Sequence, residues 1–404
     1  MQKSLFGFKY ALVNLTYFAA YCSVHSFATV FLLERGFSNT QIGIFLSIAN
    51  IFAMLLQPFL AGLIDKGTIF TNRYVVILNA LIIIAGSILL FFVKSGIVGI
   101  FIIYLLIYTI QQACQPFIVA MYFEYKGRDS DDNSDFGFFR GLGSFGFAML
   151  SLFIGNLVEK YGINRLLYAN IIIMSIALVV TLFFKKPESA GDLVEAKDEK
   201  IAEKAHNNFI DFARIYPKYM VFLLGVIFFF FGHNMLNDYL ILIIRNVGGA
   251  EGNLGIATSI AAALEFPAMI ICYRFIKRFG INKVLMFSGV AFLVKIIILY
   301  LAKNMGMIYL SQAIQMFAYA VLIPGAAYYS NSIMQENDSV KGQAYFVSAI
   351  TIGGIFSSFI SGRVIDLYGV SRMLFVGILI SVIGVVLFAA ALFDGLFHSK
   401  QASC

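Results

Sequence analysis

The chain is poor in charged residues, in cysteine and in catalytic motifs. Asp, Glu, Lys and Arg make up 13% of its 404 residues, against roughly 25% in an ordinary soluble domain. The four cysteines show neither disulfide nor metal-ligand spacing, and we expect them to be passive packing residues: Cys22, Cys114, Cys272 and Cys404. The sequence shows no nucleophile–base set, metal-ligand cluster or phosphate-binding glycine loop. We therefore expect neither an enzyme nor an ATP-driven pump, and neither a cofactor nor a metal.

Long apolar runs dominate what is present. The chain is 60% hydrophobic and contains twelve apolar runs of 18 residues or more. Each run is long enough for a helix to cross a bilayer, whereas a membrane strand needs only roughly 9–11 residues. The runs lie at about 8–33, 41–65, 74–93, 97–123, 136–158, 165–184, 219–243, 253–276, 284–302, 305–329, 343–365 and 373–395. The first run is too long for the apolar region of a signal peptide. The sequence predicts an all-α integral membrane protein with twelve transmembrane helices.

A short phrase recurs between the apolar runs. It has the pattern aromatic–Gly–aliphatic–polar–basic and occurs at 161–165, 279–283 and 368–372, with a looser copy at 65–73. A glycine turn beside a basic residue is typical of a tight, water-facing hinge between membrane helices. Two copies lie about half the chain apart, which indicates a duplicated, repeat-based transporter. We expect hinge or gating roles for Asp65, Lys66, Arg73, Gly162, Gly280 and Gly369.

A polar, charged stretch interrupts the apolar runs at 186–214. It divides the chain into six-helix bundles at 1–185 and 215–404, and we interpret it as a cytoplasmic linker, with a regulatory docking site as the alternative. With the amino terminus inside, most of the 29 Lys and Arg residues fall on the inner side. This distribution predicts a multi-pass protein of the cell (plasma or inner) membrane with both termini cytoplasmic. The net charge of +7 is then explained by the basic residues that face the cytoplasm, and we do not expect nucleic-acid binding.

Two ionisable residues lie deep inside apolar runs. Glu265 and Lys295 are both roughly 18–20 Å from the predicted inner surface, at about 1.5 Å per residue. Opposite charges at one depth on consecutive helices can pair, and Pro267 would free backbone carbonyls beside the glutamate. A structural ion pair that fixes helix packing is one interpretation. The other, which we favour, assigns proton coupling or substrate binding to this pair.

Uncharged polar side chains at membrane depth are the remaining candidates. His233 and Asn234 belong to a polar cluster in the outer half of helix 7, where a gate or pocket rim is expected. Amides lie at membrane depth in helix 4 (Gln111, Gln112 and Gln115) and in helix 10 (Gln312 and Gln315), and we assign substrate binding to Gln115 and Gln315. Amide side chains suit hydroxyl-rich ligands because each hydroxyl needs both a donor and an acceptor. Hydrogen bonding between helices is the competing explanation for the amides. We expect His25 in helix 1 to be a satisfied interior histidine rather than a proton relay.

The layout of two halves with twelve helices and hinge phrases at 65–73 and 274–283 resembles the major facilitator superfamily, in which each half consists of 3+3 inverted repeats. Within that superfamily, the Gln-Pro pair and the Gly, Asp and Lys residues in 57–66 resemble the oligosaccharide:proton symporter (lactose permease-like) group. So does the stretch 133–140, which ends Phe-Gly-Phe-Phe-Arg. The resemblance implies that Arg140 binds the substrate and that Phe147 stacks on a sugar ring.

The resemblance to this group is partial in the carboxyl half. Lys295 falls on the group's helix 9 arginine, whereas Gln315 falls on its helix 10 histidine and Ala318 on its proton-carrying glutamate. The group's coupling chemistry is therefore not carried over intact. The pattern Glu265-x-Pro267 is closer to the sister branch that includes phenylpropionate-type permeases.

These features predict a secondary active transporter that imports a sugar, an oligosaccharide or a similar small polar solute together with protons, by alternating access. Separation of Glu265 from Lys295 would let the carboxylate take up a proton, and re-forming the pair would release it. The alternatives are a proton-coupled aromatic-acid or drug permease and, in another class, a non-transporting membrane sensor. We expect the partners to be a small-molecule substrate, protons and membrane lipid, with no nucleic acid, and the protein to be a monomer.

Overall fold

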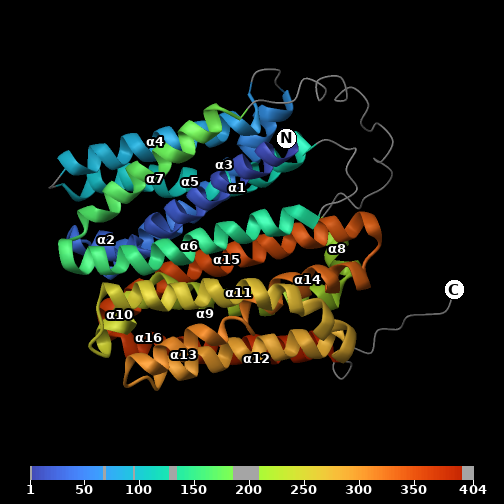
Figure 1. Ribbon diagram of the computed structural model, residues 1–404. Coiled ribbons are helices and arrows are strands. Elements are labelled where there is room, and N and C mark those ends of the chain that lie inside the picture. The colour runs from blue at the N-terminus through green and yellow to red at the C-terminus, as the bar shows by residue number, and fades with distance from the viewer. Residues whose placement is uncertain (1, 67–69, 94–95, 127–133, 185–208, 394–404) are drawn as a thin grey trace. The chain divides into compact units, whose positions relative to one another are not determined.

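The computed structural model describes residues 2–66, 70–93, 96–126, 134–184 and 209–393, and every regular element in these ranges is helical (Figure 1). The helices are α1 (Gln2–Tyr21), the π-helix η1 (Cys22–Ser26), α2 (Ala28–Glu34), α3 (Asn39–Lys66), α4 (Asn72–Phe92), α5 (Ile97–Lys126), α6 (Ser134–Tyr161), α7 (Asn164–Leu182), α8 (Phe209–Ile215), α9 (Pro217–Asp238), α10 (Leu240–Asn246), α11 (Glu251–Phe279), α12 (Ile281–Tyr300), α13 (Met305–Ile314), α14 (Tyr319–Ile333), α15 (Glu336–Tyr368) and α16 (Val370–Leu392). The predicted all-α class is confirmed.

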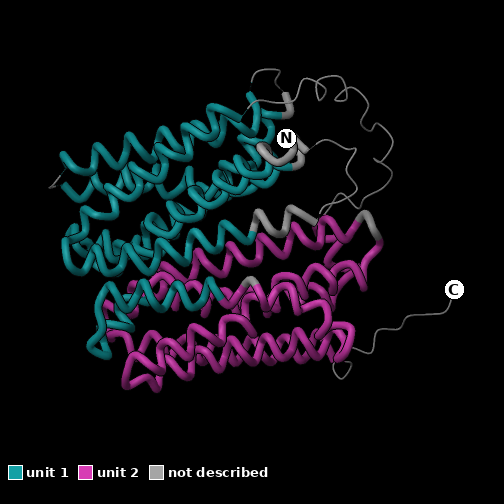
Figure 2. Tube along the Cα trace, viewed as in Figure 1, with its two compact units in different colours: residues 1–197, 240–263 teal, residues 198–239, 264–404 magenta. Residues whose placement is uncertain are grey.

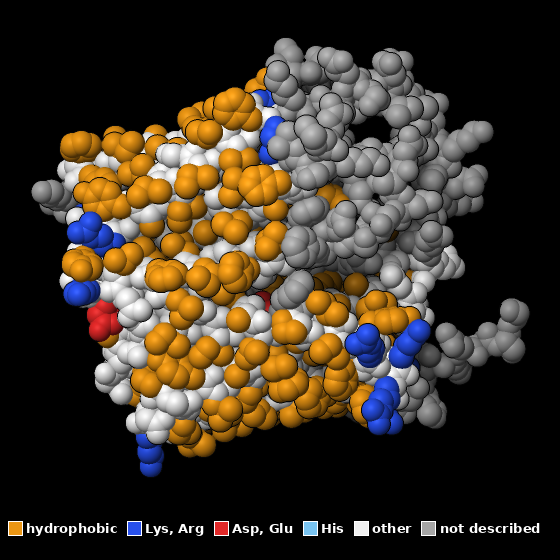
Figure 3. Space-filling view, viewed as in Figure 1, with side chains coloured by type: hydrophobic (Ala, Val, Ile, Leu, Met, Phe, Trp, Pro, Cys, Tyr) orange, Lys and Arg blue, Asp and Glu red, His pale blue; other side chains and the backbone are white. Residues whose placement is uncertain are grey.

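Twelve spans can be counted in the described residues. Ten helices are long and apolar enough to cross a membrane, and two more spans are bent pairs of helices. One pair joins Gly7–Ser26 to Ala28–Glu34 at 46°, and the other joins Glu251–Glu265 to Pro267–Phe279 at 41°. On the face shown in Figure 3, apolar side chains cover the middle, and Lys and Arg lie toward the edges. This distribution fits a surface that meets lipid between two aqueous layers.

The chain forms two compact units (Figure 2). Unit 1 comprises residues 1–197 and 240–263, and unit 2 comprises residues 198–239 and 264–404. Residues 240–263, which are α10 and the first half of α11, thus belong to the unit formed mainly by the amino-terminal half. The predicted division at 185 and 215 stays a prediction. Of the predicted linker, 186–208 lies outside the described residues, and 209–214 lies in α8.

Helix–helix packing builds each unit around its own interior. In unit 1, α1 packs on α6 and α7, α4 on α5 and α7, and α3 on α5. In unit 2, α9 packs on α15 and α16, and α12 on α13, α14 and α16. The interior of unit 2 is aromatic: the ring of Phe388 stacks on Phe222 at 4.8 Å and meets Phe229 edge-on at 4.7 Å. Offset and edge contacts of this kind stabilise a close-packed interior.

Two parts of the chain share one local architecture. Helices α2 and α10 have seven residues each and follow helix breaks at Phe27 and Tyr239. Each leads into a glycine with positive φ, Gly36 (86°) or Gly248 (83°). Four features of the first part have counterparts in the second: the helix break, the short helix, the glycine and the start of the next long helix (α3 or α11). Each feature lies the same number of residues before its counterpart. This agreement supports the duplication that the repeated phrase predicts.

The glycines of the repeated phrase have backbone that other residues rarely adopt. The φ values of Gly162, Gly280 and Gly369 are 85°, 83° and 81°. At Gly280 and Gly369 the ψ values are 148° and 173°, a region in which another residue costs on the order of 1–3 kcal/mol. Each of these two glycines ends one long helix and starts the next, and their gating role stays a prediction.

Arg73, another predicted gating residue, caps a helix. Its guanidinium donates to the backbone carbonyls of Thr181 at 3.0 Å and Leu182 at 2.6 Å, at the carboxyl end of α7. These bonds satisfy carbonyls that have no partner within the helix. The side chains of Asp65 and Lys66 lie outside the described residues.

Candidate functional site

Unit 2 contains a hydrogen-bonded chain that joins the two ionisable residues of the apolar runs. Gln315 Nε2 donates to Glu265 Oε1 at 2.8 Å, and Lys295 Nζ donates to Gln315 Oε1. One amide therefore links the acid to the base, with its NH2 group toward the carboxylate and its carbonyl toward the ammonium. The structure thus brings together three of the residues that the sequence singles out, and we call them the Glu–Gln–Lys chain.

Lys295 is fully buried, with 0% of its surface exposed. It lies on α12, whose backbone at this point accepts a further hydrogen bond, from Ser311 Oγ to the Lys295 carbonyl at 3.1 Å. A buried ammonium is unfavourable unless acceptors surround it. The Gln315 carbonyl supplies one such acceptor.

Two residues of the Glu–Gln–Lys chain, Glu265 and Gln315, lie where a helix is distorted. Glu265 ends the first segment of bent α11, and Pro267, which has no N–H, begins the second. Gln315 lies in the break between α13 and α14, where Ser288 Oγ donates to the Ala318 carbonyl at 2.7 Å. Irregular backbone at membrane depth is tolerated where protein or an aqueous cavity surrounds it. In transporters, discontinuous helices of this kind form substrate and ion sites.

His233 lies in an aromatic setting in the same unit. Its ring stacks on Tyr319, at the start of α14, with centroids 5.1 Å apart, and meets Phe292 edge-on at 5.8 Å. Asn237 hydrogen bonds its Nε2 at 2.9 Å, while Nδ1 is buried without a hydrogen-bond partner among the described residues. Asn234 is half-buried and makes no hydrogen bond within the described part of the chain.

Two of the candidates predicted in the amino-terminal half have side chains that the structure describes, Gln115 and Phe147. Gln115 on α5 and Phe147 on α6 are half-buried, and neither makes a hydrogen bond or a ring contact with the other predicted site residues that the structure describes. The side chain of Arg140 lies outside the described residues. Its predicted substrate contact stays a prediction.

A second polar cluster lies in unit 1 around Gln112, one of the amides that the sequence singles out in helix 4. Tyr21 Oη donates to Gln112 Oε1 at 2.9 Å, and Gln112 Nε2 donates to Asn50 Oδ1 at 3.5 Å. Gln57 Nε2 donates to the Gln112 carbonyl, also at 3.5 Å. The sequence names Gln111, Gln112 and Gln115 as candidates but does not say which of these amides meets the polar groups of neighbouring helices.

His25 differs from its expected state. Both of its ring nitrogens are buried and have no hydrogen-bond partner among the described residues. The expectation of a satisfied interior histidine is therefore wrong. The residue lies in η1, and a π-helical turn inserts one extra residue, which changes the direction of the side chains around it.

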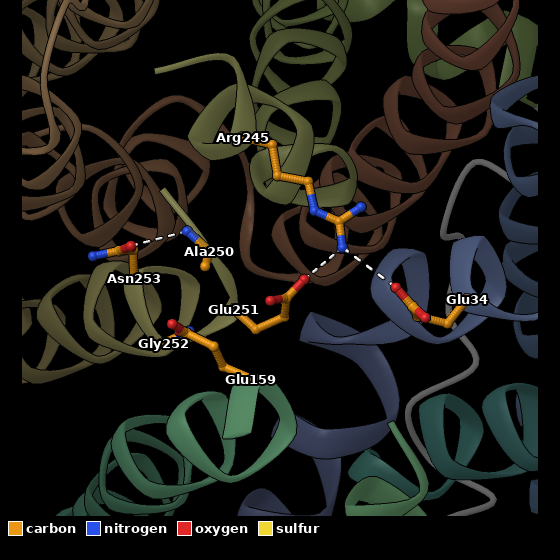
Figure 4. Close-up of polar contacts among 7 residues, drawn as sticks. All are labelled: Glu34, Glu159, Arg245, Ala250, Glu251, Gly252 and Asn253. Carbon is orange, nitrogen blue, oxygen red and sulfur yellow. Dashed lines mark hydrogen bonds and ion pairs between the residues drawn. The ribbon is translucent and has the colours of Figure 1, made fainter. Parts of the chain in front are cut away.

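A charged cluster lies at the end of unit 1 where α2, α6, α10 and α11 meet (Figure 4). The Arg245 guanidinium is 2.5 Å from Glu251 Oε1 and 3.6 Å from Glu34 Oε1. Glu159 Oε2 accepts a hydrogen bond from the backbone N–H of Gly252 at 2.8 Å. A carboxylate is favourable at this place because the first N–H groups of α11 point toward it. The cluster joins residues from both halves of the sequence within one unit.

Below this cluster, α6 and α11 approach each other closely. A Cβ atom at Gly155 would lie 2.5 Å from the Glu251 carbonyl oxygen and 3.1 Å from Gly255 Cα. Ser151 Oγ donates to the Gly255 carbonyl at 3.0 Å and also bonds the Thr258 hydroxyl. Small residues let membrane helices come into backbone contact.

Comparison with known proteins places the chain among transporters. The MFS_1 like family matches residues 8–392. The maltose permease of Geobacillus stearothermophilus is 23% identical over 390 residues, which cover 95% of this chain and 93% of the permease. The uncharacterized transporter YwbF of Bacillus subtilis (strain 168) is 23% identical over 346 residues, covering 82% of this chain and 80% of that protein.

Solved transporters share the fold. The crystal structure of the nucleoside transporter NupG has a TM-score of 0.79 at 16% identity, covering 96% of this chain and 98% of that one. An auto-inhibited POT family peptide transporter has a TM-score of 0.71 at 13% identity and covers 99% of both chains. Together with the family match over nearly the whole length, the twelve helical spans identify the chain as a multi-pass membrane transporter of the MFS_1 like family.

Proposed function

We propose that this transporter imports a sugar, an oligosaccharide or a similar small polar solute together with protons, and that the Glu–Gln–Lys chain couples the two. The observation that carries the proposal is the single amide between a carboxylate and a buried ammonium, at two distorted helices. Similarity to a maltose permease supports a sugar as the cargo.

The amide of Gln315 links the Glu–Gln–Lys chain to the charges of Glu265 and Lys295. Its NH2 group can only donate and its carbonyl can only accept, so the orientation of Gln315 suits an ionised Glu265 and a protonated Lys295. A flipped amide would turn its NH2 group toward the ammonium, which is unfavourable because both groups are donors. This orientation fits an ionised Glu265 and a protonated Lys295 linked through one amide.

Substrate binding would disturb this arrangement. A sugar hydroxyl both donates and accepts, so it can compete for Gln315 or Lys295 and weaken the link to Glu265. A buried carboxylate without its cationic partner favours the neutral form and takes up a proton from the side then open to water. When the chain re-forms, the carboxylate ionises and the proton leaves on the opposite side. Rocking of the helix bundles would supply the change of access.

Uptake into sealed vesicles tests the proposal. The cargo panel holds labelled maltose, other sugars and aromatic acids, with and without an imposed inward proton gradient. Glu265→Gln is compared with Glu251→Gln, the same change on the same helix but in the charged cluster at its end. We expect the wild type and Glu251→Gln to accumulate a sugar, and Glu265→Gln to equilibrate it without accumulation.

Other outcomes would redirect the assignment. Gradient-driven accumulation by Glu265→Gln would refute coupling through this carboxylate. Accumulation of an aromatic acid instead of a sugar would favour the aromatic-acid permease, with Lys295 receiving the carboxylate. Equilibration without accumulation by the wild type would mean a facilitator, and the Glu–Gln–Lys chain would then have a structural role.

A further inference from the structure

We propose that unit 1 carries its own binding subsite for the ring of a neutral, hydroxyl-bearing ligand such as a sugar. Its residues are Tyr21, His25, Asn50, Gln57, Tyr108 and Gln112. The choice of a sugar rests on the proposed function. The subsite itself rests on ring stacking, unused hydrogen-bonding groups and exposure at membrane depth.

Three rings form the apolar part of the subsite. The imidazole of His25 stacks on Tyr21, with centroids 3.8 Å apart and an interplanar angle of 12°. Its other neighbour is Tyr108, at 3.9 Å and 52°. Tyr21 and His25 are partly exposed. Aromatic residues that combine an apolar face with a polar edge are well suited to a ligand with both kinds of surface.

The polar part of the subsite is a set of amide side chains whose hydrogen bonds to other residues of the protein are long and therefore weak. The bonds from Gln112 to Asn50 and from Gln57 to the Gln112 backbone are both 3.5 Å long, at the outer limit of a hydrogen bond. Asn50 Nδ2 and Gln57 Oε1 have no hydrogen-bond partner among the described residues. Each amide carries two donors and an acceptor, so these side chains retain capacity for a ligand.

His25 adds a donor and an acceptor. Neither ring nitrogen has a hydrogen-bond partner in the described part of the chain, although both are buried. An imidazole buried in this way is unfavourable, and buried polar groups normally find a partner. A ligand hydroxyl that reaches the ring edge after a small rotation of the imidazole would supply one.

The depth of the cluster indicates that its exposed part does not face lipid. Asn50 lies eleven residues into α3, so it is about 16 Å along that helix. Asn50, Gln57 and Gln112 are partly exposed there. Uncompensated polar groups in contact with hydrocarbon are costly, so this face of unit 1 must line the aqueous transport path. None of the six side chains is acidic or a permanent cation, which favours a neutral ligand.

Equilibrium binding of labelled maltose to the purified full-length protein tests the subsite without any gradient. Tyr21→Phe removes the hydroxyl that bonds Gln112, and Gln112→Leu removes the amide. Tyr10→Phe is the matched control, because its hydroxyl also lies on α1 but donates to the Ile118 backbone at 3.2 Å. We expect each cluster variant to weaken binding about tenfold or more, and the control to stay within about twofold of the wild type.

A second measurement tests the subsite even if the Tyr21 and Gln112 variants do not fold. A cysteine at Asn50 in the otherwise native chain should react with a small thiol reagent, and maltose should slow that reaction, whereas it should not slow reaction of a cysteine at the exposed Ser371. Maltose binding that is unchanged in Tyr21→Phe and Gln112→Leu, or reaction at position 50 that maltose does not slow, would overturn the subsite and leave the proposed function intact. A wild type that binds neither maltose nor any other sugar of the panel would overturn both.

Discussion

Lys295 is a fully buried cation in unit 2. A fully buried ammonium depends on the acceptors around it, and the Gln315 carbonyl is one of them. Removing one charge of a buried pair typically leaves the other uncompensated, whereas removing both can be nearly neutral. If Glu265 and Lys295 are coupled, the double variant should therefore lose less stability than the two single variants together, whereas the losses of two unrelated residues should add.

A double-variant cycle tests this coupling. We expect Glu265→Gln and Lys295→Gln to lower the free energy of unfolding in mixed micelles by about 3 kcal/mol each, and the double variant to regain at least half of the summed loss. Lys303→Gln, at an exposed position, should change stability by less than about 0.5 kcal/mol. Additive losses in the double variant would show that the two charges do not interact through Gln315.

The contact between α6 and α11 sets the packing at the charged end of unit 1. Backbone atoms meet there because Gly155 and Gly255 face each other, and Ser151 is fully buried against them. The ion pairs of Arg245 above this contact are partly exposed and therefore weak. Close packing, more than charge, is what holds these helices together.

Gly155→Ala should separate the two helices. Its Cβ atom would lie 2.5 Å from a backbone oxygen, which cannot move without shifting α11. In a Ser151→Cys background we expect this change to speed alkylation at position 151 about tenfold, measured by peptide mass spectrometry, which corresponds to ~1.4 kcal/mol. Gly62→Ala, in the same background, should leave the rate unchanged, because nothing lies within 4 Å of its added Cβ. Equal rates in the two variants would contradict the packing argument.

For the whole molecule, the predicted orientation of the twelve spans is open to a direct test. Ser371, in the last copy of the repeated phrase, is predicted to be outside, and Lys277, at the end of α11, inside. Both side chains are exposed. With the bilayer placed around the twelve spans, the two positions should differ in access from the cell exterior.

Cysteines at these two positions report the orientation. We expect a membrane-impermeant maleimide to label Ser371→Cys on intact cells, and Lys277→Cys only after permeabilisation. The wild type is the background control: Cys22, Cys114 and Cys272 are buried, and any labelling of Cys404, which lies outside the described residues, is subtracted. The reverse labelling pattern would place both termini outside and invert the direction assigned to the proton gradient.

The sequence by itself determined the number of spans, the all-α class, the family and the glycines with positive φ between helices. Run length and the thickness of a bilayer leave little choice of structure, and a positive φ at a helix junction favours glycine. Depth along a helix is also readable, so Glu265 and Lys295 were expected at one level.

Only the tertiary structure decided which polar side chains meet. Helix rotation cannot be read from spans that are apolar on every face, so Gln315 between acid and base, and Gln112 rather than Gln115 in the unit 1 cluster, were not predictable. The helix breaks at Phe27 and Tyr239 contain no proline and left no signal in the sequence. Packing in three dimensions fixes those contacts, because each depends on residues that are far apart in the chain.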